Sequence, residues 1–406
     1  MNSVTIHRPS SAIRASVDLP RSKSVSNRAL LMASLCGDLG LVSDLSDGDD
    51  TRVMLELLRT NPRVMDCGAG GTTFRFLLAW AAVREGEEHL LTGIPRLLER
   101  PHDDLINALR ALGADIERVP EGYRVRGRVL KGGEVHFDSP ISSQYLSALL
   151  MVAPRMKEGL TLRWTGTRLS EPFVHMTMKM LAHFGVYPRL ELDGVRVDPG
   201  AYVPSPIRVP PDWSSAAFWY EIVALSPGAE VVLAGLGDDT MQGDREAQRL
   251  WAPWVGTRFT EEGAQLVHRE QPGTWEELPR NLRHVPDLFQ PLALTLAARN
   301  QPAVFTGLDN LRVKETDRLR AVADVITRLG GVAAFAEGAF AVKKGLDHRS
   351  PGTFSPDIDH RMAMALAPLA LQLGSITITD PTVVNKSYPS YWKDLEKAGF
   401  SIVFNG

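Results

Sequence analysis

Hydrophobic and polar residues alternate along this chain with the period of helices in some segments and of strands in others. The clearest helical pattern has apolar residues at intervals of three or four positions: Leu319, Val322, Ile326 and Leu329. This spacing places apolar side chains on one face of an α-helix, where they would be buried. The pattern therefore predicts an amphipathic helix over residues 319–329.

The segment just before this helix, residues 312–318, carries two arginines, a lysine and two carboxylates. We expect Thr316 to be the N-cap, so that Lys314, Glu315 and Arg318 gather at the helix start. Free backbone N–H groups and the helix dipole favour an anion there. Such a run of charged residues is more commonly just the solvent-exposed start of a helix. A catalytic carboxylate beside an anion-binding site explains better why these charges adjoin a buried face.

A longer pattern repeats along the chain: an amphipathic helix, a terminating glycine, and two short strands around a tight turn. The glycines expected to end these helices stand at positions 113, 185, 256, 330 and 399, which are 72, 71, 74 and 69 residues apart. Glycine suits the left-handed position after a helix. Glu-Gly or Asp-Gly pairs suit hairpin turns, and they occur at 121–122, 193–194, 262–263 and 337–338. The period fits a small α/β repeat better than a solenoid.

Six such repeats would divide into two domains of three. The helix expected over residues 54–60 has no hairpin turn after it, so we interpret the first repeat as truncated. The proline-rich residues 203–211 are the best candidate boundary. We therefore predict an α/β fold with one domain at residues 20–210 and a second at 1–19 plus 211–406, with an active site in the cleft between them.

Composition narrows the functional classes. Hydrophobic content of 44%, charged content of 23% and a net charge of −3 are typical of an ordinary soluble globular protein. No overall basic charge favours nucleic acid or a membrane surface. The two cysteines, Cys36 and Cys67, suggest neither disulfides nor a zinc site, and we expect both to be small core residues. Without a signal-type or membrane-spanning stretch, the chain is expected in the cytoplasm, without a metal or other cofactor.

Several expected helix starts share a polar or glycine-rich loop before an apolar helix. They lie at residues 20–28, 68–75, 142–144, 312–318 and 359–361. Hydroxyls, glycine amides and helix N-termini donate hydrogen bonds, and four of the five segments add lysine or arginine. Any one of them is best explained as ordinary capping, but five together favour a ligand with several anionic groups. Walker and complete dinucleotide-binding spacings are absent. The aspartate pairs at 49–50, 103–104 and 238–239 are interpreted as turns or caps.

At this point several long motifs, in order, resemble the EPSP synthase family. They include Ser-Lys-Ser-Val-Ser-Asn-Arg from Ser22, Gly-Thr-Thr-Phe-Arg from Gly71, Ser-Ser-Gln-Tyr-Leu from Ser142, Leu-Arg-Val-Lys-Glu-Thr-Asp-Arg from Leu311 and Asp-His-Arg-Met-Ala from Asp359. The resemblance runs from Leu19 to the Lys-Ser-Tyr-Pro segment that begins at Lys386. It implies two domains of three βαβαββ repeats. It also implies transfer of the enolpyruvyl group of phosphoenolpyruvate to the 5-hydroxyl of shikimate 3-phosphate, with release of phosphate.

The resemblance also implies roles for individual residues. The 3-phosphate of shikimate would be bound by Ser142, Ser143, Ser170 and Lys314, the rest of the shikimate ligand by Ser24, Arg28, Gln144, Asp287 and Asn310, and phosphoenolpyruvate by Lys23, Gly71, Arg100, Arg318, Arg361 and Lys386. Proton transfer would fall to Glu315 and Asp287, and Lys23 would protonate the leaving phosphate.

Three positions depart from the family pattern: Ala69 replaces an Asn, Phe173 a Tyr and Phe76 a Pro. The charged set is nevertheless complete, so these changes suggest altered affinities. The alternatives are enolpyruvyl transfer to a UDP-amino sugar and a non-catalytic protein that binds shikimate 3-phosphate. An enzyme that acts on nucleic-acid ends fits the negative net charge poorly. We expect a monomer with no nucleic-acid or membrane partner, whose domains close on shikimate 3-phosphate.

Two further patterns are given structural explanations. The second Asp-His-Arg triplet, at residues 347–349, is interpreted as a loop. Four tryptophans are expected to belong to the core or an interface rather than to stack on a cofactor: Trp213, Trp219, Trp251 and Trp254.

Overall fold

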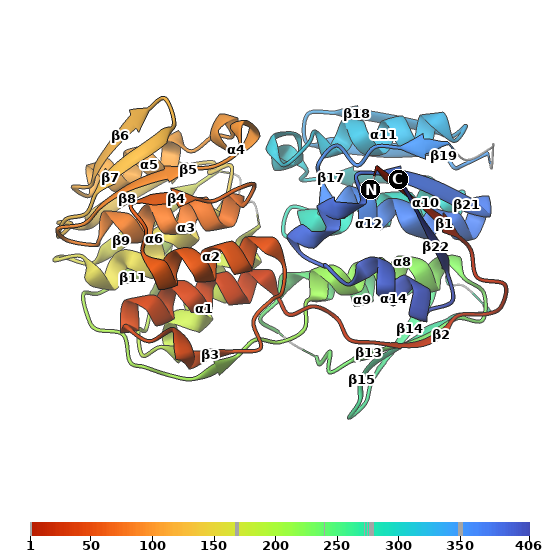
Figure 1. Ribbon diagram of the computed structural model, residues 1–406, viewed down its shortest axis with the longest axis horizontal. Coiled ribbons are helices and arrows are strands. Elements are labelled where there is room, and N and C mark those ends of the chain that lie inside the picture. Colours follow the sequence, from red (N-terminus) through yellow and green to blue (C-terminus); the bar gives the residue numbers. More distant parts are fainter. Residues whose placement is uncertain are drawn as a thin grey trace. The chain divides into compact units, whose positions relative to one another are not determined.

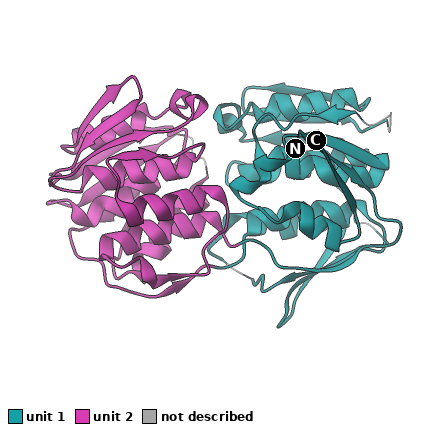
Figure 2. Cartoon of the chain, in the orientation of Figure 1, with its two compact units in different colours: residues 1–20, 210–406 teal, residues 21–209 magenta. Residues whose placement is uncertain are grey.

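The computed structural model describes residues 2–166, 170–238, 240–271, 273, 275, 280–347 and 352–406. The chain divides into two compact units (Figure 2): unit 1 comprises residues 1–20 and 210–406, and unit 2 residues 21–209. The sequence patterns predict divisions between 19 and 20 and between 210 and 211, each one residue from the division in the structure. His348 and Arg349 of the second Asp-His-Arg triplet lie outside the described residues.

Unit 2 contains two complete repeats whose strands and main helices follow the same order, the first with one additional short helix, α4 (Figure 1). The first consists of β4 (Val64–Asp66), α3 (Gly71–Ala82), β5 (Glu88–Thr92), α4 (Pro95–Glu99), α5 (Asp103–Ala111), β6 (Asp115–Val119) and β7 (Gly122–Arg126). The second consists of β8 (Gly133–Asp138), α6 (Ser143–Val152), β9 (Leu160–Thr165), α7 (Glu171–His183), β10 (Arg189–Glu191) and β11 (Gly194–Val197). Their sheets have the strand orders β4-β5-β7-β6 and β8-β9-β11-β10. In both, the first two strands are parallel and the hairpin is antiparallel.

The remaining repeat of unit 2 is shorter, as the sequence predicts. It consists of α1 (Lys23–Cys36), the 3-10 helix η1 (Leu39–Leu41), β3 (Val42–Ser43), α2 (Asp49–Thr60) and β12 (Ile207–Arg208). Among the described residues its sheet consists of β12 and β3, which are parallel. Helix α2 ends at Asn61 in the left-handed conformation, and β4 of the next repeat follows without an intervening hairpin.

Unit 1 contains three four-stranded sheets. The first repeat has β2 (Arg14–Val17), α8 (Trp213–Leu225), β13 (Glu230–Ala234), η3 (Gly243–Glu246), α9 (Ala247–Leu250), β14 (Val255–Phe259) and β15 (Gly263–His268). The next has β16 (Arg280–Asn281), η4 (Pro286–Leu288), α10 (Phe289–Ala298), β17 (Ala303–Thr306), η5 (Asp309–Val313), α11 (Arg318–Arg328), β18 (Val332–Ala336) and β19 (Ala339–Lys344). Their strand orders are β2-β13-β15-β14 and β16-β17-β19-β18.

The last repeat of unit 1 is completed by the N-terminus. It contains β20 (Thr353–Phe354), α12 (His360–Leu366), α13 (Ala370–Leu373), β21 (Ser375–Thr379), η7 (Pro381–Lys386), α14 (Tyr391–Lys397) and β22 (Ser401–Asn405). Strand β1 (Ser3–His7) lies between β21 and β22 and is antiparallel to both. The N- and C-terminal strands are therefore neighbours in one sheet (Figure 1).

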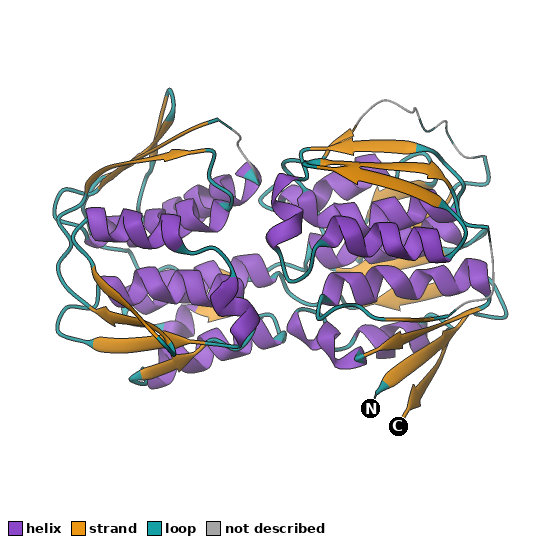
Figure 3. Cartoon of the chain, turned by 90° about the horizontal axis from the view of Figure 1, so that it is seen from above, coloured by secondary structure: helices purple, strands orange, loops and turns teal. Residues whose placement is uncertain are grey.

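Within each unit the sheets lie on the outside and helices fill the interior (Figure 3). Helix α8 is buried along its whole length. Trp213, Trp219, Trp251 and Trp254 all belong to the hydrophobic core of unit 1, which confirms the sequence prediction. No helix among the described residues is long and apolar enough to cross a bilayer.

Most of the predicted helix ends and hairpin turns are confirmed. Gly113, Gly185, Gly330 and Gly399 follow helices with positive φ, as the left-handed position requires. The four hairpins turn at the expected Glu-Gly and Asp-Gly pairs. The prediction for Gly256 is wrong, because this residue lies inside β14, opposite Val267 of β15. The preceding helix α9 ends at Leu250, and buried Trp251 and Trp254 fill the turn that follows it.

Candidate active site

The charged segment of unit 1 ends where helix α11 begins. The N-cap is Asp317, whose carboxylate accepts a hydrogen bond from the backbone N–H of Arg320 at 3.2 Å. The prediction that Thr316 caps this helix is therefore wrong by one residue. The predicted apolar face is confirmed, because Leu319, Val322 and Ile326 are fully buried.

Arg318, the first residue of α11, is the centre of a buried ion-pair network. Its Nε donates to Oδ2 of Asp359 at 2.7 Å, its Nη1 to Oδ1 of Asp287 at 2.8 Å, and its Nη2 to Oε2 of Glu315 at 3.3 Å. Burial opposes the charge on Arg318, but these three carboxylates outweigh it and raise its pKa above the usual value. A buried guanidinium paired in this way keeps its charge and fixes the positions of its partners.

Asp287, on η4, is held in its ionised form. Its Oδ2 accepts from Nη2 of Arg361 at 3.0 Å, in addition to the contact with Arg318. Burial alone would raise the pKa of Asp287, but the charges of Arg361, Lys314 and Arg318 lower it well below the usual range. Asp287 is therefore a carboxylate at neutral pH.

The second predicted catalytic carboxylate, Glu315, lies between two cations. Its Oε1 accepts from Nζ of Lys386 at 2.7 Å and its Oε2 from Arg318. Lys386 is the last residue of η7. The structure thus brings five predicted residues into one network and places Lys314 close enough for its charge to act on Asp287. Asn310, on η5, is buried, and its Oδ1 has no hydrogen-bond partner among the described residues.

Asp359 organises this network, although the sequence patterns gave it no separate role. It is fully buried and is the N-cap of α12, where its Oδ1 accepts from the backbone N–H of Arg361 at 2.9 Å. The same carboxylate binds Arg318. One side chain therefore fixes the start of α12 and the start of α11 together.

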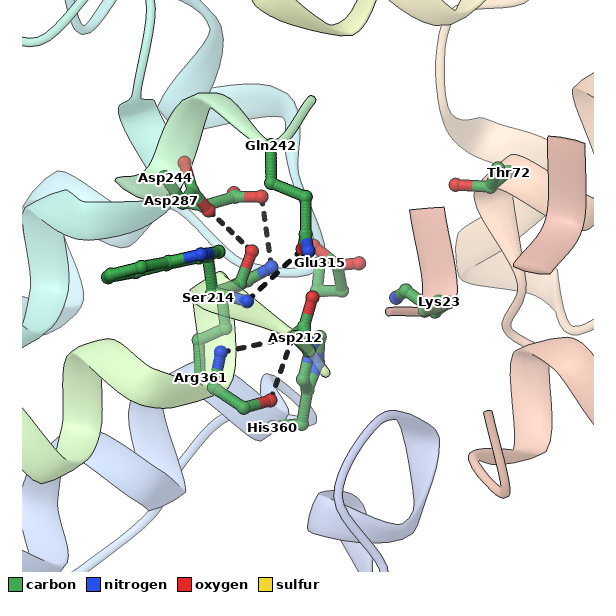
Figure 4. A network of polar contacts seen from close by, with 12 residues as sticks. Lys23, Thr72, Asp212, Ser214, Gln242, Asp244, Asp287, Glu315, His360 and Arg361 are labelled. Atoms are coloured by element: carbon green, nitrogen blue, oxygen red, sulfur yellow. Dashed lines mark hydrogen bonds and ion pairs between the residues drawn. The ribbon is translucent and has the colours of Figure 1, made fainter. Parts of the chain in front are cut away.

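A further group of polar residues in unit 1 lies beside Asp287 (Figure 4). Asp212 caps helix α8 through the backbone N–H of Ser215 at 3.0 Å. Gln242 accepts from the backbone N–H of Trp213 at 3.1 Å. The Ser214 hydroxyl donates to Oδ2 of Asp244, and the charge of Asp287 acts on Asp244. Sequence reasoning missed this group, and its only visible signal is the polar run Gln242-Gly-Asp244.

In unit 2, Lys23 begins helix α1 and pairs with a buried aspartate. Its Nζ lies 2.9 Å from Oδ2 of Asp50, in the first turn of α2. The sequence predicts a turn or cap at the pair 49–50, but the N-cap is Gly48 and both aspartates lie in the first turn of α2, where Asp50 also pairs with Lys23. The backbone oxygen of Ser24, the next residue of α1, accepts a hydrogen bond from Nη1 of Arg28 at 2.9 Å.

Arg28 is buried among neutral groups. Its Nε donates to Oγ1 of Thr177 at 2.8 Å and its Nη2 to Oγ of Ser147 at 3.0 Å. Burial lowers its pKa to about 9, so the guanidinium remains charged at neutral pH. The rings of Phe76 and Phe173 lie 5.2 and 5.8 Å from its guanidinium carbon. Two of the three departures from the family pattern therefore adjoin this one cation.

Gly71 and Arg100 lie against each other at the start of helix α3. A Cβ on Gly71 would stand 2.6 Å from Nη1 of Arg100, so a larger residue would displace the guanidinium from this position. Ala69, the third departure, precedes this helix start in a described loop. The N-terminus of α3, with its free backbone N–H groups, therefore lies beside a cation, as an anion site requires.

The hydroxyl and amide residues of unit 2 form a second small cluster. Gln144 accepts from Nη1 of Arg75 at 2.6 Å and donates to Oγ1 of Thr72 at 2.9 Å. Ser142 caps α6 and accepts from the backbone N–H of Gln144 at 3.3 Å. Ser143 is buried at the same helix start. Ser170 is buried at the start of α7 with a φ of 55°, a left-handed conformation.

The described residues contain no group of three or more His, Cys, Asp or Glu side chains arranged to hold a metal ion. Among the two thiols, Cys67 is buried as expected, whereas Cys36 is only partly buried. The chemistry of the clusters is instead that of cations, helix starts and carboxylates.

Comparisons with known proteins agree with this chemistry. A family model described as EPSP synthase (3-phosphoshikimate 1-carboxyvinyltransferase) matches residues 7–62 and 60–395. The chain is 42% identical over 401 residues to a 3-phosphoshikimate 1-carboxyvinyltransferase of Bacteroides fragilis, with 97% of each chain covered. It is 33% identical over 432 residues to the enzyme of that name from Aliivibrio fischeri, covering 98% of this chain and 99% of the relative. An EPSP synthase structure from Acinetobacter baumannii has the same fold, with a TM-score of 0.76, 23% identity, and 99% and 100% of the two chains covered.

Proposed function

This chain belongs to the EPSP synthase family, and from that premise we propose how its residues carry out the transfer. The reaction moves the enolpyruvyl group of phosphoenolpyruvate to the 5-hydroxyl of shikimate 3-phosphate and releases phosphate. The observation that carries the proposal is the network of Arg318 in unit 1, which holds Asp287 and Glu315 beside Arg361 and Lys386. Acid–base carboxylates and anion-binding cations are thereby combined in one place.

Asp287 accepts a hydrogen bond from the 5-hydroxyl in this proposal. Because its pKa is well below the usual range, Asp287 is ionised and is suited to orient a hydroxyl rather than to donate a proton. Asn310 binds a neighbouring shikimate hydroxyl, for which its buried Oδ1 supplies an acceptor.

Glu315 carries out the proton transfers at carbon. As the 5-hydroxyl oxygen adds, its proton passes to Asp287, and Glu315 in its acid form gives a proton to the methylene carbon of phosphoenolpyruvate. The resulting methyl group returns a proton to Glu315 when phosphate leaves with a proton from Lys23, and the proton released by the hydroxyl restores Lys23. Glu315 has Lys386 and Arg318 on its two oxygens, so its carboxylate is fixed while the proton moves. The negative charges of phosphoenolpyruvate are neutralised by four cations: Arg318, Arg361 and Lys386 of unit 1 and Arg100 of unit 2.

The residues of unit 2 bind the phosphate groups. Ser142, Ser143 and Ser170 stand at helix starts and donate to the 3-phosphate, together with Lys314 of unit 1. Arg28 and Gln144 contact the shikimate ligand, and Ser24 belongs to the same helix start as Lys23. Lys23, oriented by Asp50, protonates the leaving phosphate. Gly71 lets phosphoenolpyruvate approach Arg100.

We also propose that the protein acts in the cytoplasm as a monomer. Both cysteines are free, which suits a reducing compartment.

The deciding experiment measures phosphate release from phosphoenolpyruvate with and without shikimate 3-phosphate, in buffer that contains a metal chelator. We expect release only when shikimate 3-phosphate is present. No release, with shikimate 3-phosphate still bound, would contradict the proposal and favour a binding protein. Release with a UDP-amino sugar in place of shikimate 3-phosphate would favour the other transferase.

A further inference from the structure

A second carboxyl group lies beside Asp287, and the mechanism above does not use it. Asp244 belongs to η3 and is 2% exposed. The side chains of Asp244 and Asp287 lie close together in Figure 4, although they come from different elements of unit 1. The charge of Asp287 acts on Asp244, and two neighbouring carboxyl groups, one of them almost fully buried, do not both carry a charge at low cost.

The hydrogen bonds of Asp244 fit a neutral acid better than an anion. The Ser214 hydroxyl donates to Oδ2. Oδ1 is buried and has no hydrogen-bond partner among the described residues. A buried carboxylate normally accepts several hydrogen bonds or pairs with a cation. Asp287 meets this requirement through Arg318 and Arg361, whereas Asp244 has a single hydroxyl.

The charges around Asp244 also favour its neutral form. Asp212 at the start of α8 and Asp287 on η4 disfavour a further negative charge, whereas Arg361 on α12 favours one. Arg245, next in the chain, is paired with Asp238. Burial and the charge of Asp287 raise the pKa of Asp244 to about 7, against the opposing effects of Arg361 and Ser214. Lys314 and Arg318 act on Asp287, so the proton of the pair belongs on Asp244.

We propose that Asp244 is a positioning residue for Asp287: it lies beside that carboxylate as a neutral carboxylic acid, so that Arg361 pairs with Asp287 alone. This inference rests on the proposed function, because it takes Asp287 to contact the substrate. An ionised Asp244 competes for Arg361 and adds a negative charge near the site of two anionic substrates. Substrate binding therefore favours the protonated form and draws a proton onto Asp244 when the pH is above 7.

The test compares the parent protein with Asp244→Asn, which is permanently neutral, and Ser214→Ala, which removes the hydrogen bond to Oδ2. Glu246→Gln is the matched control, because Glu246 lies two residues away on η3 and pairs with Arg249. Calorimetry of shikimate 3-phosphate binding at pH 7.5, in two buffers of different ionisation enthalpy, gives the number of protons taken up. We expect less uptake in Asp244→Asn than in the parent, and the parental value in Glu246→Gln.

The pH profile of kcat/KM for phosphoenolpyruvate gives the second readout. In the parent we expect a decline above pH about 7, the pKa of Asp244, approaching about tenfold per pH unit for loss of one required proton. Asp244→Asn should lack this decline. Ser214→Ala should shift it to higher pH, because the Ser214 hydrogen bond lowers the pKa of Asp244. A loss of packing alone would reduce activity without moving the pH at which it falls.

Identical proton uptake and identical pH profiles in the parent and Asp244→Asn would overturn the inference. If Asp244→Asn does not fold, the carboxyl ¹³C resonance of Asp244 in the unaltered protein decides. A resonance that titrates near pH 7 supports the inference, and one that stays at the ionised position from pH 6 to 8 overturns it. Failure of the proposed function is recognised separately, as the absence of phosphate release from the parent at any pH.

Discussion

Lys386 and Glu315 form an ion pair of 2.7 Å between Nζ and Oε1, although 71 positions separate them in the chain. The pair joins the end of η7 to the segment before α11, within unit 1. It places a cation against one oxygen of the proposed acid–base residue, while Arg318 holds the other oxygen. The orientation of Glu315 therefore depends on two cations from two different elements.

Replacing Glu315 by glutamine should remove proton transfer at carbon while preserving the shape of the side chain. We expect kcat for phosphate release to fall by about 100- to 10,000-fold, the usual contribution of a general acid or base. The affinity for shikimate 3-phosphate, measured by calorimetry, should change much less. Glu337→Gln, in the exposed turn between β18 and β19, is the control and should leave kcat unaltered. Near-parental turnover of Glu315→Gln would remove this residue from the mechanism.

Lys23→Met should impair departure of the phosphate. The change deletes the ammonium group and leaves buried Asp50 without its 2.9 Å partner. We expect kcat/KM for phosphoenolpyruvate to drop by about 100-fold or more, as when one charge-stabilising donor is lost. Lys157→Met serves as the control, because Lys157 is exposed on the same unit. Equal kinetics for the two variants would exclude Lys23 from catalysis.

Arg318→Met should destabilise unit 1 as well as inactivate the enzyme. Asp359 would remain fully buried without this cation, whereas Asp287 keeps Arg361, and leaving a buried charge uncompensated typically costs about 3–5 kcal/mol. Arg312→Met removes an exposed pair with Asp317 and should cost less than about 1 kcal/mol. Urea unfolding followed by tryptophan fluorescence measures both. If Arg318→Met lost as little stability as Arg312→Met, the buried network of Arg318 would contribute little to the free energy of unfolding.

Glu221 should make the stability of unit 1 fall as the pH rises. It is fully buried in α8, neither of its oxygens has a hydrogen-bond partner among the described residues, and burial raises its pKa well above the usual 4.5. The folded protein therefore keeps a proton that the unfolded chain releases above pH about 4.5. Its contribution to the free energy of unfolding declines by about 1.4 kcal/mol per pH unit from there up to the folded pKa.

Glu221→Gln should abolish this decline. Urea unfolding at a series of pH values compares the variant with the parent and with Glu261→Gln, an exposed residue of the turn between β14 and β15. The glutamine variant should lose less stability than the parent between pH 5 and 8. Parallel pH dependences in all three proteins would mean that Glu221 ionises in the folded state as it does in the unfolded chain.

The repeats could be predicted from the sequence because their signals are local. A helix that ends at Gly113 or Gly330 and a hairpin that turns at Gly122 or Gly338 each need a particular backbone conformation, and glycine adopts it readily. Gly256 shows the limit of this reasoning. It lies in a strand. The preceding helix ends at Leu250, and the turn after it is filled by buried tryptophans whose packing depends on distant elements.

The contacts of the candidate site could be predicted less completely. Thr316 and Asp317 are both good N-caps, and only the direction in which the chain enters α11 decides between them. Asp50, Asp244 and Asp359 look like ordinary turn or cap residues in the sequence. Their roles come from partners 27, 30 and 41 positions away, which fold topology alone brings together.

The position of β1 between β21 and β22 has a consequence for the order in which the chain can fold during synthesis. Residues 21–209 are continuous, so unit 2 has all of its strands once that segment has left the ribosome. Strand β1 emerges before unit 2, whereas its two neighbours follow unit 2 in the chain. Strand β2 must likewise wait for β13. We therefore expect β1 and β2 to remain unpaired while unit 2 is made, and the sheets of unit 1 to close only after β13, β21 and β22 have emerged.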